Sequence, residues 1–456
     1  MRPQVRWTAV VAVVAGAMLL STACTPGGGQ PTGSAKETGQ ATVTDPAQMG
    51  NLTLTVWDGQ TQGAEDGVMN ALNAAFEKKY PNITINRVSR SFEDLRTALR
   101  LAVTDKTGPD VVQPNKGRPD MGAFVQAGLL RPLDKYAAAY GWDKRFPASI
   151  LNWSRWSSDA KDWGKGSLYG VPQLDEVVGI YYNKATLDAL GLEPPQTWEE
   201  FEAQLVKIKD AGKIPIQFGN VEQWPAIHEY GLIQSRYEPA ETIRELGFGN
   251  KGADYQSDGN LKAATTLQDW ATSGFFAPGY NGQTYDDSSR LYGQGNGVFF
   301  IGGTWLLTDF VKALGDNVGF MLPPPNQAGQ PIVAPGGPDL CFSVTANSKN
   351  PDAAAAYIDF ITNDDAMSQL ATAGVLPINN LGSAAPSSGA GAQVRDALKA
   401  ITDAGGMVPY LDYGTPTMYD TITVALQDLL AKRVTPEDFT ARLQNDYANF
   451  TFTGVG

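Results

Sequence analysis

Residues 52–56 read Leu-Thr-Leu-Thr-Val, which is the two-residue alternation of a β-strand. A helix is predicted over residues 68–79, because Val68, Leu72 and Phe76 recur at helical spacing until Pro81 ends the pattern. A strand at 83–85, a helix at 92–103 and a short buried strand at 108–112 follow in the same way. This alternation predicts an α/β fold with a mainly parallel sheet covered by helices.

A second series of elements begins near residue 169. Strands are predicted at 177–182, 214–218 and 298–301. Helix starts are predicted at Thr197, where Glu200 completes a capping box, and at Thr435, where Pro436 occupies the first helical position. The chain beyond residue 50 has about 400 residues, which exceeds one ordinary core and suits two domains.

The N-terminal segment has the pattern of an export signal. Arg2 and Arg6 precede an apolar stretch over residues 8–20, which is too short to span a bilayer. Small residues precede Cys24, so we expect a signal peptide over residues 1–23. Residues 25–50 are rich in Gly, Pro, Ser and Thr and predict a flexible linker.

The junction before Cys24 resembles the bacterial lipobox, whose cysteine receives a diacylglyceryl group. Ser21 stands where that pattern usually has leucine, and the same small residues suit an ordinary secretory peptidase. We therefore expect lipidation of Cys24, with free secretion as the alternative. The lipid anchor would be the chain's contact with the membrane.

Composition argues against several classes of function. The chain has 35 Lys and Arg, two of them in the signal peptide, against 48 Asp and Glu, so the remainder carries a net charge of −15. That acidity argues against nucleic acid or anionic lipid as a partner. Cys341 lies in an apolar run and predicts a buried thiol, and no intrachain disulfide is expected. The single histidine, His228, argues against a zinc site or a Ser-His-Asp arrangement, and we expect it to be packed or on the surface.

A set of short motifs then covers nearly the whole chain after residue 50. They occupy residues 57–58, 74–81, 108–112, 128–134, 168–172, 180–184, 195–201, 302–305, 336–337 and 350–356. In order and spacing they resemble family 1 extracellular solute-binding proteins, the relatives of the maltose-binding protein that serve ABC importers.

The resemblance implies a type II periplasmic-binding-protein fold with two α/β lobes, a hinge and ligand in the cleft. By analogy the first lobe holds residues 51–170 with 336–378, and the second holds 171–335 with 379–456. Crossings are expected near Pro172, Pro335 and Pro377. The resemblance also implies a monomer that delivers its ligand to ABC permease subunits. No cofactor, metal or catalytic residue is expected.

A carbohydrate is the expected ligand, because aromatic rings suit the apolar face of a pyranose and polar side chains suit its hydroxyls. We select candidate residues that follow strands whose ends should face the cleft. The resemblance to the family supports some of these positions. The candidate residues are Trp57, Asp58, Gln60, Gln113, Asn115, Asp175, Glu176, Trp224, Trp305, Gly337, Asp339, Asp412 and Tyr413.

Alternative interpretations remain open for several of these residues. Trp57 and Trp224 could be buried anchors at the bases of loops, and Gly337 could supply unusual backbone angles at a hinge. Asp175 and Glu176 could serve an exported glycosidase, although neighbours on a strand point to opposite faces. A surface adhesin or sensor that binds sugar also fits the sequence, as does a binder of a non-sugar solute.

Overall fold

The computed structural model describes residues 42–61, 63–379 and 386–450. The predicted signal peptide, Cys24 and most of the linker lie outside this range. Within it, no helix combines the length and the apolar character that crossing a membrane requires.

The first sheet is the one predicted from the opening stretch of sequence. Its strand order is β2-β1-β3-β11-β6, and β1 pairs in parallel with both β2 and β3. β11 runs antiparallel to its neighbours β3 and β6. The bounds are β1 (Leu52–Asp58), β2 (Ile83–Ser89), β3 (Val111–Val112), β6 (Val171–Pro172) and β11 (Cys341–Val344).

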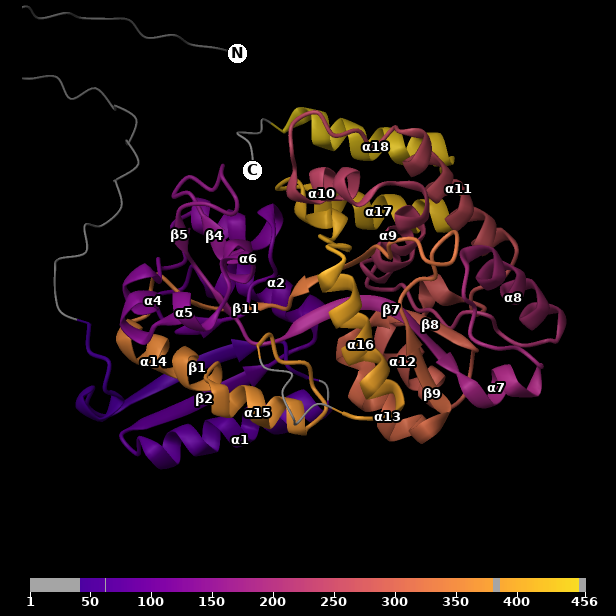
Figure 1. The fold of residues 1–456 in the computed structure, drawn as a ribbon. Helices are drawn as coiled ribbons and strands as arrows, with labels where there is room; N and C mark the ends of the chain where they lie inside the picture. The colour runs from indigo at the N-terminus through magenta and orange to yellow at the C-terminus, as the bar shows by residue number, and fades with distance from the viewer. Residues whose placement is uncertain (1–41, 62, 380–385, 451–456) are drawn as a thin grey trace, which may run out of the picture. The chain divides into compact units, whose positions relative to one another are not determined.

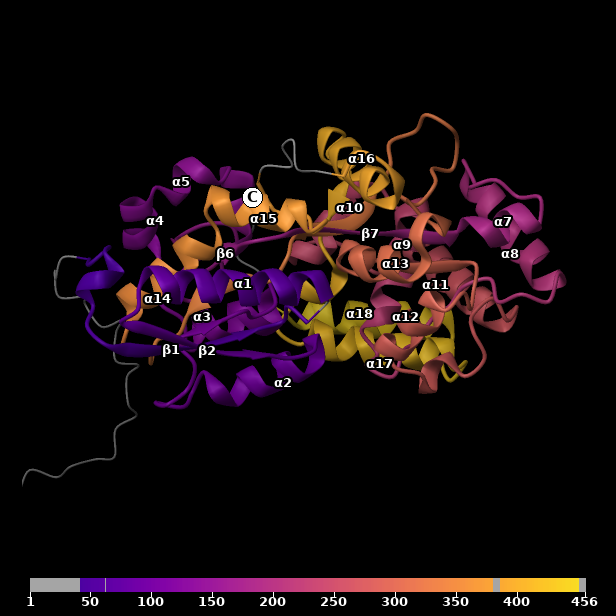
Figure 2. The same ribbon diagram turned by 90° about the horizontal axis from the view of Figure 1, so that it is seen from below.

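Helices cover this sheet, and α1, α14 and α15 lie side by side in both ribbon views (Figures 1 and 2). Leu54, Val56, Phe76 and Tyr357 are fully buried among them. The bounds are α1 (Gly63–Lys79), α2 (Phe92–Ala102), α3 (Ala123–Gln126), α4 (Asp134–Tyr140), α5 (Trp142–Arg145), α6 (Ala148–Leu151), α14 (Pro351–Ile361) and α15 (Asp364–Thr372), with a small hairpin of β4 (Arg155–Trp156) and β5 (Ser167–Leu168).

The second sheet is built differently, because its long central strand β7 is antiparallel to β8, β9 and β10. By contrast, β12 pairs in parallel with β10. The predicted strand at 214–218 is wrong: Ile216 forms isolated bridges only, next to Pro215, which has no N–H to donate to a ladder. The bounds are β7 (Asp175–Asn183), β8 (Phe299–Gly303), β9 (Val318–Met321), β10 (Ala334–Pro338) and β12 (Met407–Val408).

The helices around the second sheet begin where capping residues predict. Thr435 caps α18 as expected, and Asp438 completes a capping box that was not predicted. Thr197 also caps α8, but Glu200 accepts from the N–H of Gln196 at 2.7 Å, one residue before the predicted partner. The bounds are α7 (Lys184–Ala189), α8 (Trp198–Asp210), α9 (Pro225–Tyr237), α10 (Ala240–Phe248), α11 (Asp258–Thr272), α12 (Tyr285–Gly293), α13 (Leu307–Leu314), α16 (Gly389–Asp403), α17 (Met418–Leu430) and α18 (Pro436–Asn449).

The chain passes between the two sheets at neighbouring places. It leaves the first sheet between β6 and β7 and returns between β10 and β11. A third passage follows α15, where the N–H of Ile378 donates to the carbonyl of Gln173 at 3.0 Å. These passages bring the end of β10 and the start of β7 beside the loops that follow β1 and β3.

Candidate functional site

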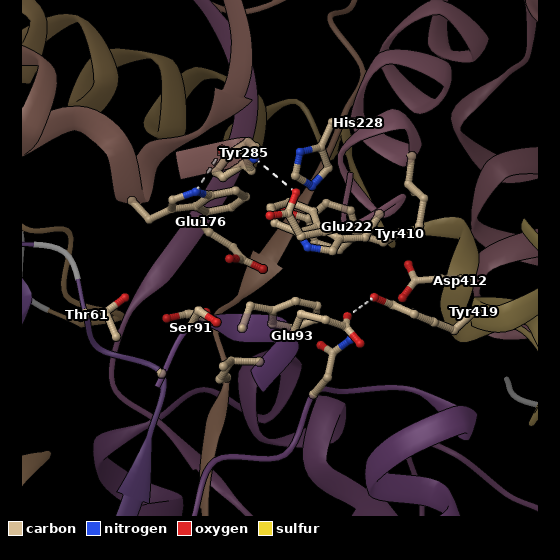
Figure 3. A pocket seen from close by; sticks show the side chains of 18 of the residues that line it. Thr61, Ser91, Glu93, Glu176, Glu222, His228, Tyr285, Tyr410, Asp412 and Tyr419 are labelled. Atoms are coloured by element: carbon tan, nitrogen blue, oxygen red, sulfur yellow. Dashed lines mark hydrogen bonds between the residues drawn. The ribbon is translucent and has the colours of Figure 1, made fainter. Parts of the chain in front are cut away.

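One pocket collects side chains from elements on both sides of these passages (Figure 3). It holds about 1140 Å³ of empty space, including the part open to solvent. Thr61, Ser91 and Glu93 project from one side, and Tyr285, His228 and Tyr410 project from the other.

The second side of the pocket carries a group of rings, here called the aromatic cluster: Trp224, His228, Tyr285, Trp305 and Tyr410. The ring centroids of Trp224 and Tyr285 are 4.6 Å apart, and those of Trp224 and His228 are 5.3 Å apart. The Nε1 of Trp305 donates to the hydroxyl of Tyr285 at 3.1 Å. Because Trp224 and Tyr285 lie at the starts of α9 and α12, the two helices hold these rings in fixed positions.

Carboxyl groups are the second feature of the pocket. None of the described residues that line it is Lys or Arg. The seven carboxyl groups are Glu65, Glu93, Glu176, Glu222, Asp286, Asp339 and Asp412. Within the described part of the chain, no group of three His, Cys, Asp or Glu residues could hold a metal ion.

Glu176 is the carboxyl at the centre of this arrangement. Lys116 lies behind it, with Nζ 3.3 Å from Glu176 Oε1, and also donates to the carbonyl of Pro338. Burial raises the pKa of Glu176 to about 8, Lys116 opposes that shift, and Asp339 adds to it. The position of Asp175 on the opposite face of β7 keeps it out of the main pocket, as strand alternation predicts.

His228 is packed, as expected, but its ring also lines the pocket. Burial lowers the pKa of His228 to about 3, so the ring is neutral at physiological pH. Its Nδ1 atom and the hydroxyl of Tyr410 are both buried without a hydrogen-bond partner in the structure. Both are therefore polar groups that a ligand could satisfy.

Two lining residues on opposite sides of the pocket contact each other. The hydroxyl of Tyr419 on α17 donates to Glu93 Oε2 on α2 at 2.7 Å, which Figure 3 marks as a dashed line. The guanidinium of Arg96 lies 3.4 Å from the centre of the Tyr419 ring and forms an ion pair of 3.0 Å with Asp120. We call the contact between Tyr419 and Glu93 the α2–α17 contact.

Eight of the thirteen candidate residues from the sequence lie together in this pocket. They are Gln60, Asn115, Glu176, Trp224, Trp305, Asp339, Asp412 and Tyr413. Glu176 rather than Asp175 therefore faces the main pocket. Asp175 lines a small adjoining cavity instead.

The remaining candidates lie close by in supporting positions. Asp58 is buried and forms an ion pair with Arg87, with 2.7 Å between Oδ2 and Nε. The centre of the Trp57 ring lies 4.8 Å from Cζ of Arg90. Trp57 and Asp58 belong to β1 rather than to the loop after it. Gln113 accepts from the N–H of Gly59 at 2.8 Å, which holds the loop that lines the pocket. Gly337 has a φ of +141°, which favours glycine.

Several lining residues were not selected from the sequence. Ser91, Phe92 and Glu93 follow β2, so the rule that selected the ends of β1 and β3 would also have selected them. Glu65, Glu222, Tyr285 and Tyr419 carry no such local signal. They reach the pocket only through the packing of helices that are distant in sequence.

Comparison with known sequences identifies the family. Residues 59–368 match the family described as bacterial extracellular solute-binding protein. The chain is 24% identical over 306 residues to the multiple sugar-binding protein of Streptococcus mutans, covering 66% of this chain and 69% of that protein. It is 26% identical over 344 residues to the maltotriose-binding protein of Pyrococcus abyssi, covering 74% and 68%.

Solved structures share the two-lobed fold. A structure described with xylan utilization by Caldanaerobius polysaccharolyticus has a TM-score of 0.76 and 24% identity over 86% of this chain and 99% of that one. The GacH receptor of Streptomyces glaucescens, solved with acarbose, has a TM-score of 0.70 and 20% identity over 88% and 100%. These relatives are binding proteins rather than enzymes. The family match spans more than half of the chain, which therefore belongs to the bacterial extracellular solute-binding proteins.

Proposed function

We propose that this chain is the substrate-binding component of an ABC importer and that it binds a carbohydrate in the pocket described above. The observation that carries the proposal is the aromatic cluster facing carboxyl and amide groups across one pocket. Rings can stack on the C–H face of a pyranose, while Gln60, Asn115 and the carboxyl groups can bond its hydroxyls. The names of two relatives, a multiple sugar-binding protein and a maltotriose-binding protein, support the same ligand class.

Closure of two lobes on the ligand is part of the proposal. We assign residues 51–170 with 336–378 to the first lobe, and 171–335 with 379–456 to the second. The membership of β6 in the first sheet and β10 in the second supports boundaries a few residues later, near 173 and 339. A sugar stabilises the closed form because only there do both sides touch it.

Delivery requires the protein to reach a membrane permease from outside the cytoplasm. We propose that Cys24 carries the lipid and that residues 25–50 allow a monomeric binding domain to reorient above the membrane. Mass spectrometry of the mature N-terminus tests the anchor. An unmodified Cys24, or cleavage elsewhere, would indicate a freely secreted binder.

Binding without catalysis is the third part of the proposal. The pocket has carboxyl groups, but its aromatic lining and its family both support capture of an intact sugar. Prolonged incubation with a bound oligosaccharide, followed by mass spectrometry of the sugar, is expected to return it unchanged. Recovery of shorter products would support the glycosidase alternative.

A ligand screen tests the central claim. Mono- and oligosaccharides, including maltotriose, raffinose, xylo-oligosaccharides and amino sugars, are added to the ligand-free protein while melting temperature and tryptophan fluorescence are recorded. At a concentration of about 100 times Kd, a ligand that binds only the folded state adds about 2.7 kcal/mol of stability. A response to amino acids, peptides or metals with none to any sugar would overturn the ligand class.

A further inference from the structure

Glu65 brings a carboxyl group to the pocket without a partner of opposite charge. It lies in the first turn of α1, lines both the main pocket and the small adjoining cavity, and is only 6% exposed. Among the described residues, its side chain has no hydrogen bond or ion pair. Burying an unpaired carboxyl group costs free energy, and a ligand group that bonds to it would offset that cost.

The charged groups that act on the pKa of Glu65 make the imbalance larger. They are Asp339 after β10, Asp309 on α13, Glu176 on β7 and Asp58 on β1, and all four are acidic. Asp58 is neutralised by Arg87, and Lys116 is paired with Glu176. Among the described residues, Glu65 therefore has no paired cation, while Lys116 acts on Asp339 as well as on Glu176. Gln60 Nε2 also donates to Asp339 Oδ2 at 3.4 Å.

Two kinds of ligand are poorly matched to this wall. The carboxyl groups are not arranged to hold a metal ion among the residues that the structure describes. An acidic sugar would add a negative charge where the pocket has no lining Lys or Arg, and the neutral His228 would offer no compensation.

We propose that the pocket selects a saccharide bearing a protonated amino group, and that Glu65 together with Asp339 binds this group. This inference rests on the proposed function, since it names the class of sugar for the same pocket. An ammonium group has three donors and no acceptor, so it can bond both carboxylates at once. The aromatic cluster on the opposite side then holds the sugar ring.

Proton release accompanies this binding. Burial raises the pKa of Glu65 well above its ordinary value, with Asp339, Asp309 and Glu176 adding to the shift, which favours a proton on this carboxyl in the empty pocket. An ammonium group favours the ionised carboxylate and displaces that proton. The heat of binding of an amino sugar should therefore depend on the ionisation enthalpy of the buffer, and that of the hydroxyl parent should depend on it less.

The experiment compares matched sugars by isothermal titration calorimetry. Glucose, galactose, mannose and cellotriose are titrated against their 2-amino-2-deoxy forms, the last being the fully deacetylated trimer of β-1,4-linked glucosamine. Glucuronic acid supplies the anionic form. The wild-type protein is expected to bind the amino member of the responding pair about tenfold more tightly than the parent, and the acid more weakly than either.

Variants assign the preference to Glu65. Glu65→Gln is expected to reduce the ratio of amino-sugar affinity to parent-sugar affinity about tenfold, because the amide can still bond a hydroxyl but no longer pairs with an ammonium group. Glu199→Gln, an exposed change on α8, is the matched control for the loss of one negative charge and should leave both affinities unchanged. If Glu65→Gln fails to fold, two other measurements test the inference. They are the amino preference of Asp339→Asn and the ratio of amino-sugar to parent-sugar affinity in the wild-type protein.

The outcomes separate this inference from the function on which it rests. A parent sugar that binds as tightly as its amino form, or an unaltered preference in Glu65→Gln, overturns the inference and leaves carbohydrate binding intact. No response to any neutral or amino sugar, with a response to another solute class, overturns the proposed function itself.

Discussion

The two sides of the pocket differ in what they offer a ligand. The side built by residues 59–115 presents mostly short polar groups, among them Gln60, Thr61, Ser91 and Asn115. The side built by residues 222–305 presents Trp224, His228, Tyr285 and Trp305. A pyranose needs both an apolar surface and hydrogen-bond partners, and neither side supplies both in full. Affinity should therefore arise when the two sides contact the ligand together.

The origins of the two sides explain this difference. Polar groups on the first side come from loops that follow parallel strands, where backbone and side chains are free to face a ligand. Rings on the second side come from the starts of α9 and α12 and from the turn after β8, where packing against the core fixes them. The first side thus selects hydroxyl geometry, and the second supplies contact area.

The largest expected effect is the loss of a ring from the second side. Trp305→Ala removes a half-buried indole from the pocket and its hydrogen bond to Tyr285, so sugar affinity should fall about 30-fold or more, as for a central binding residue. Isothermal titration calorimetry measures this. Trp305→Phe keeps a ring and should retain most of the affinity. A loss below about threefold in the alanine variant would refute the unequal roles of the two sides.

The pH dependence of stability tests the carboxyl groups between the sides. Glu176 has a pKa of about 8 in the folded protein, against 4.5 ordinarily, so the folded state holds a proton that the unfolded state has lost. Its stabilising contribution is complete below about pH 4.5 and disappears as pH rises towards about 8, with a slope of at most about 1.4 kcal/mol per pH unit. Asp175 and Asp412, with pKa values of about 7, act in the same direction.

Thermal unfolding of the ligand-free protein between pH 5 and 9 measures this slope. Glu176→Gln should flatten the fall in melting temperature at alkaline pH, and Glu199→Gln on the surface of α8 should not. Equal slopes in the wild type and Glu176→Gln would show that Lys116 keeps Glu176 ionised in the empty pocket.

A smaller effect is expected from the α2–α17 contact, which joins the two sides directly. Tyr419→Phe removes the hydrogen bond to Glu93 and should weaken sugar affinity about three- to tenfold by loosening the contact between the two sides. Thr97→Val is the matched control, since Thr97 also donates to Glu93, at 3.2 Å, but from the same helix. If both variants bind equally well, the contact contributes nothing to closure.

The first side of the pocket was largely predictable from sequence. Alternation in β1 and β2 and the short apolar run of β3 locate the strand ends, and parallel order places those ends at one edge. Gln60 and Asn115 could therefore be selected without a structure. Trp305 was found partly through family resemblance, whereas Trp224 was selected because it follows the predicted strand at 214–218, which does not form. Trp57 was predicted to follow the first strand but lies within β1. Local patterns define the ends of such elements only to within one or two residues.

The rest of the site depends on contacts that no local pattern encodes. Glu65 and Tyr419 lie on amphipathic helices, where a sequence pattern separates buried from exposed faces but does not tell which buried edge borders a pocket. The second sheet was harder still, because the antiparallel pairing of β7 with three strands joins segments more than 100 residues apart.

The smallest expected effect concerns a helix cap outside the pocket. Thr435→Ala removes the capping box of α18, which should lower the free energy of unfolding by about 1 kcal/mol, measured by urea denaturation. Sugar affinity should not change, because α18 supplies no lining residue. However, α18 packs on α17, which carries Tyr419. A loss of affinity in Thr435→Ala that disappears in the Tyr419→Phe background would therefore show that the cap acts through the α2–α17 contact, and the two sides of the pocket would then depend on the helical layer behind them.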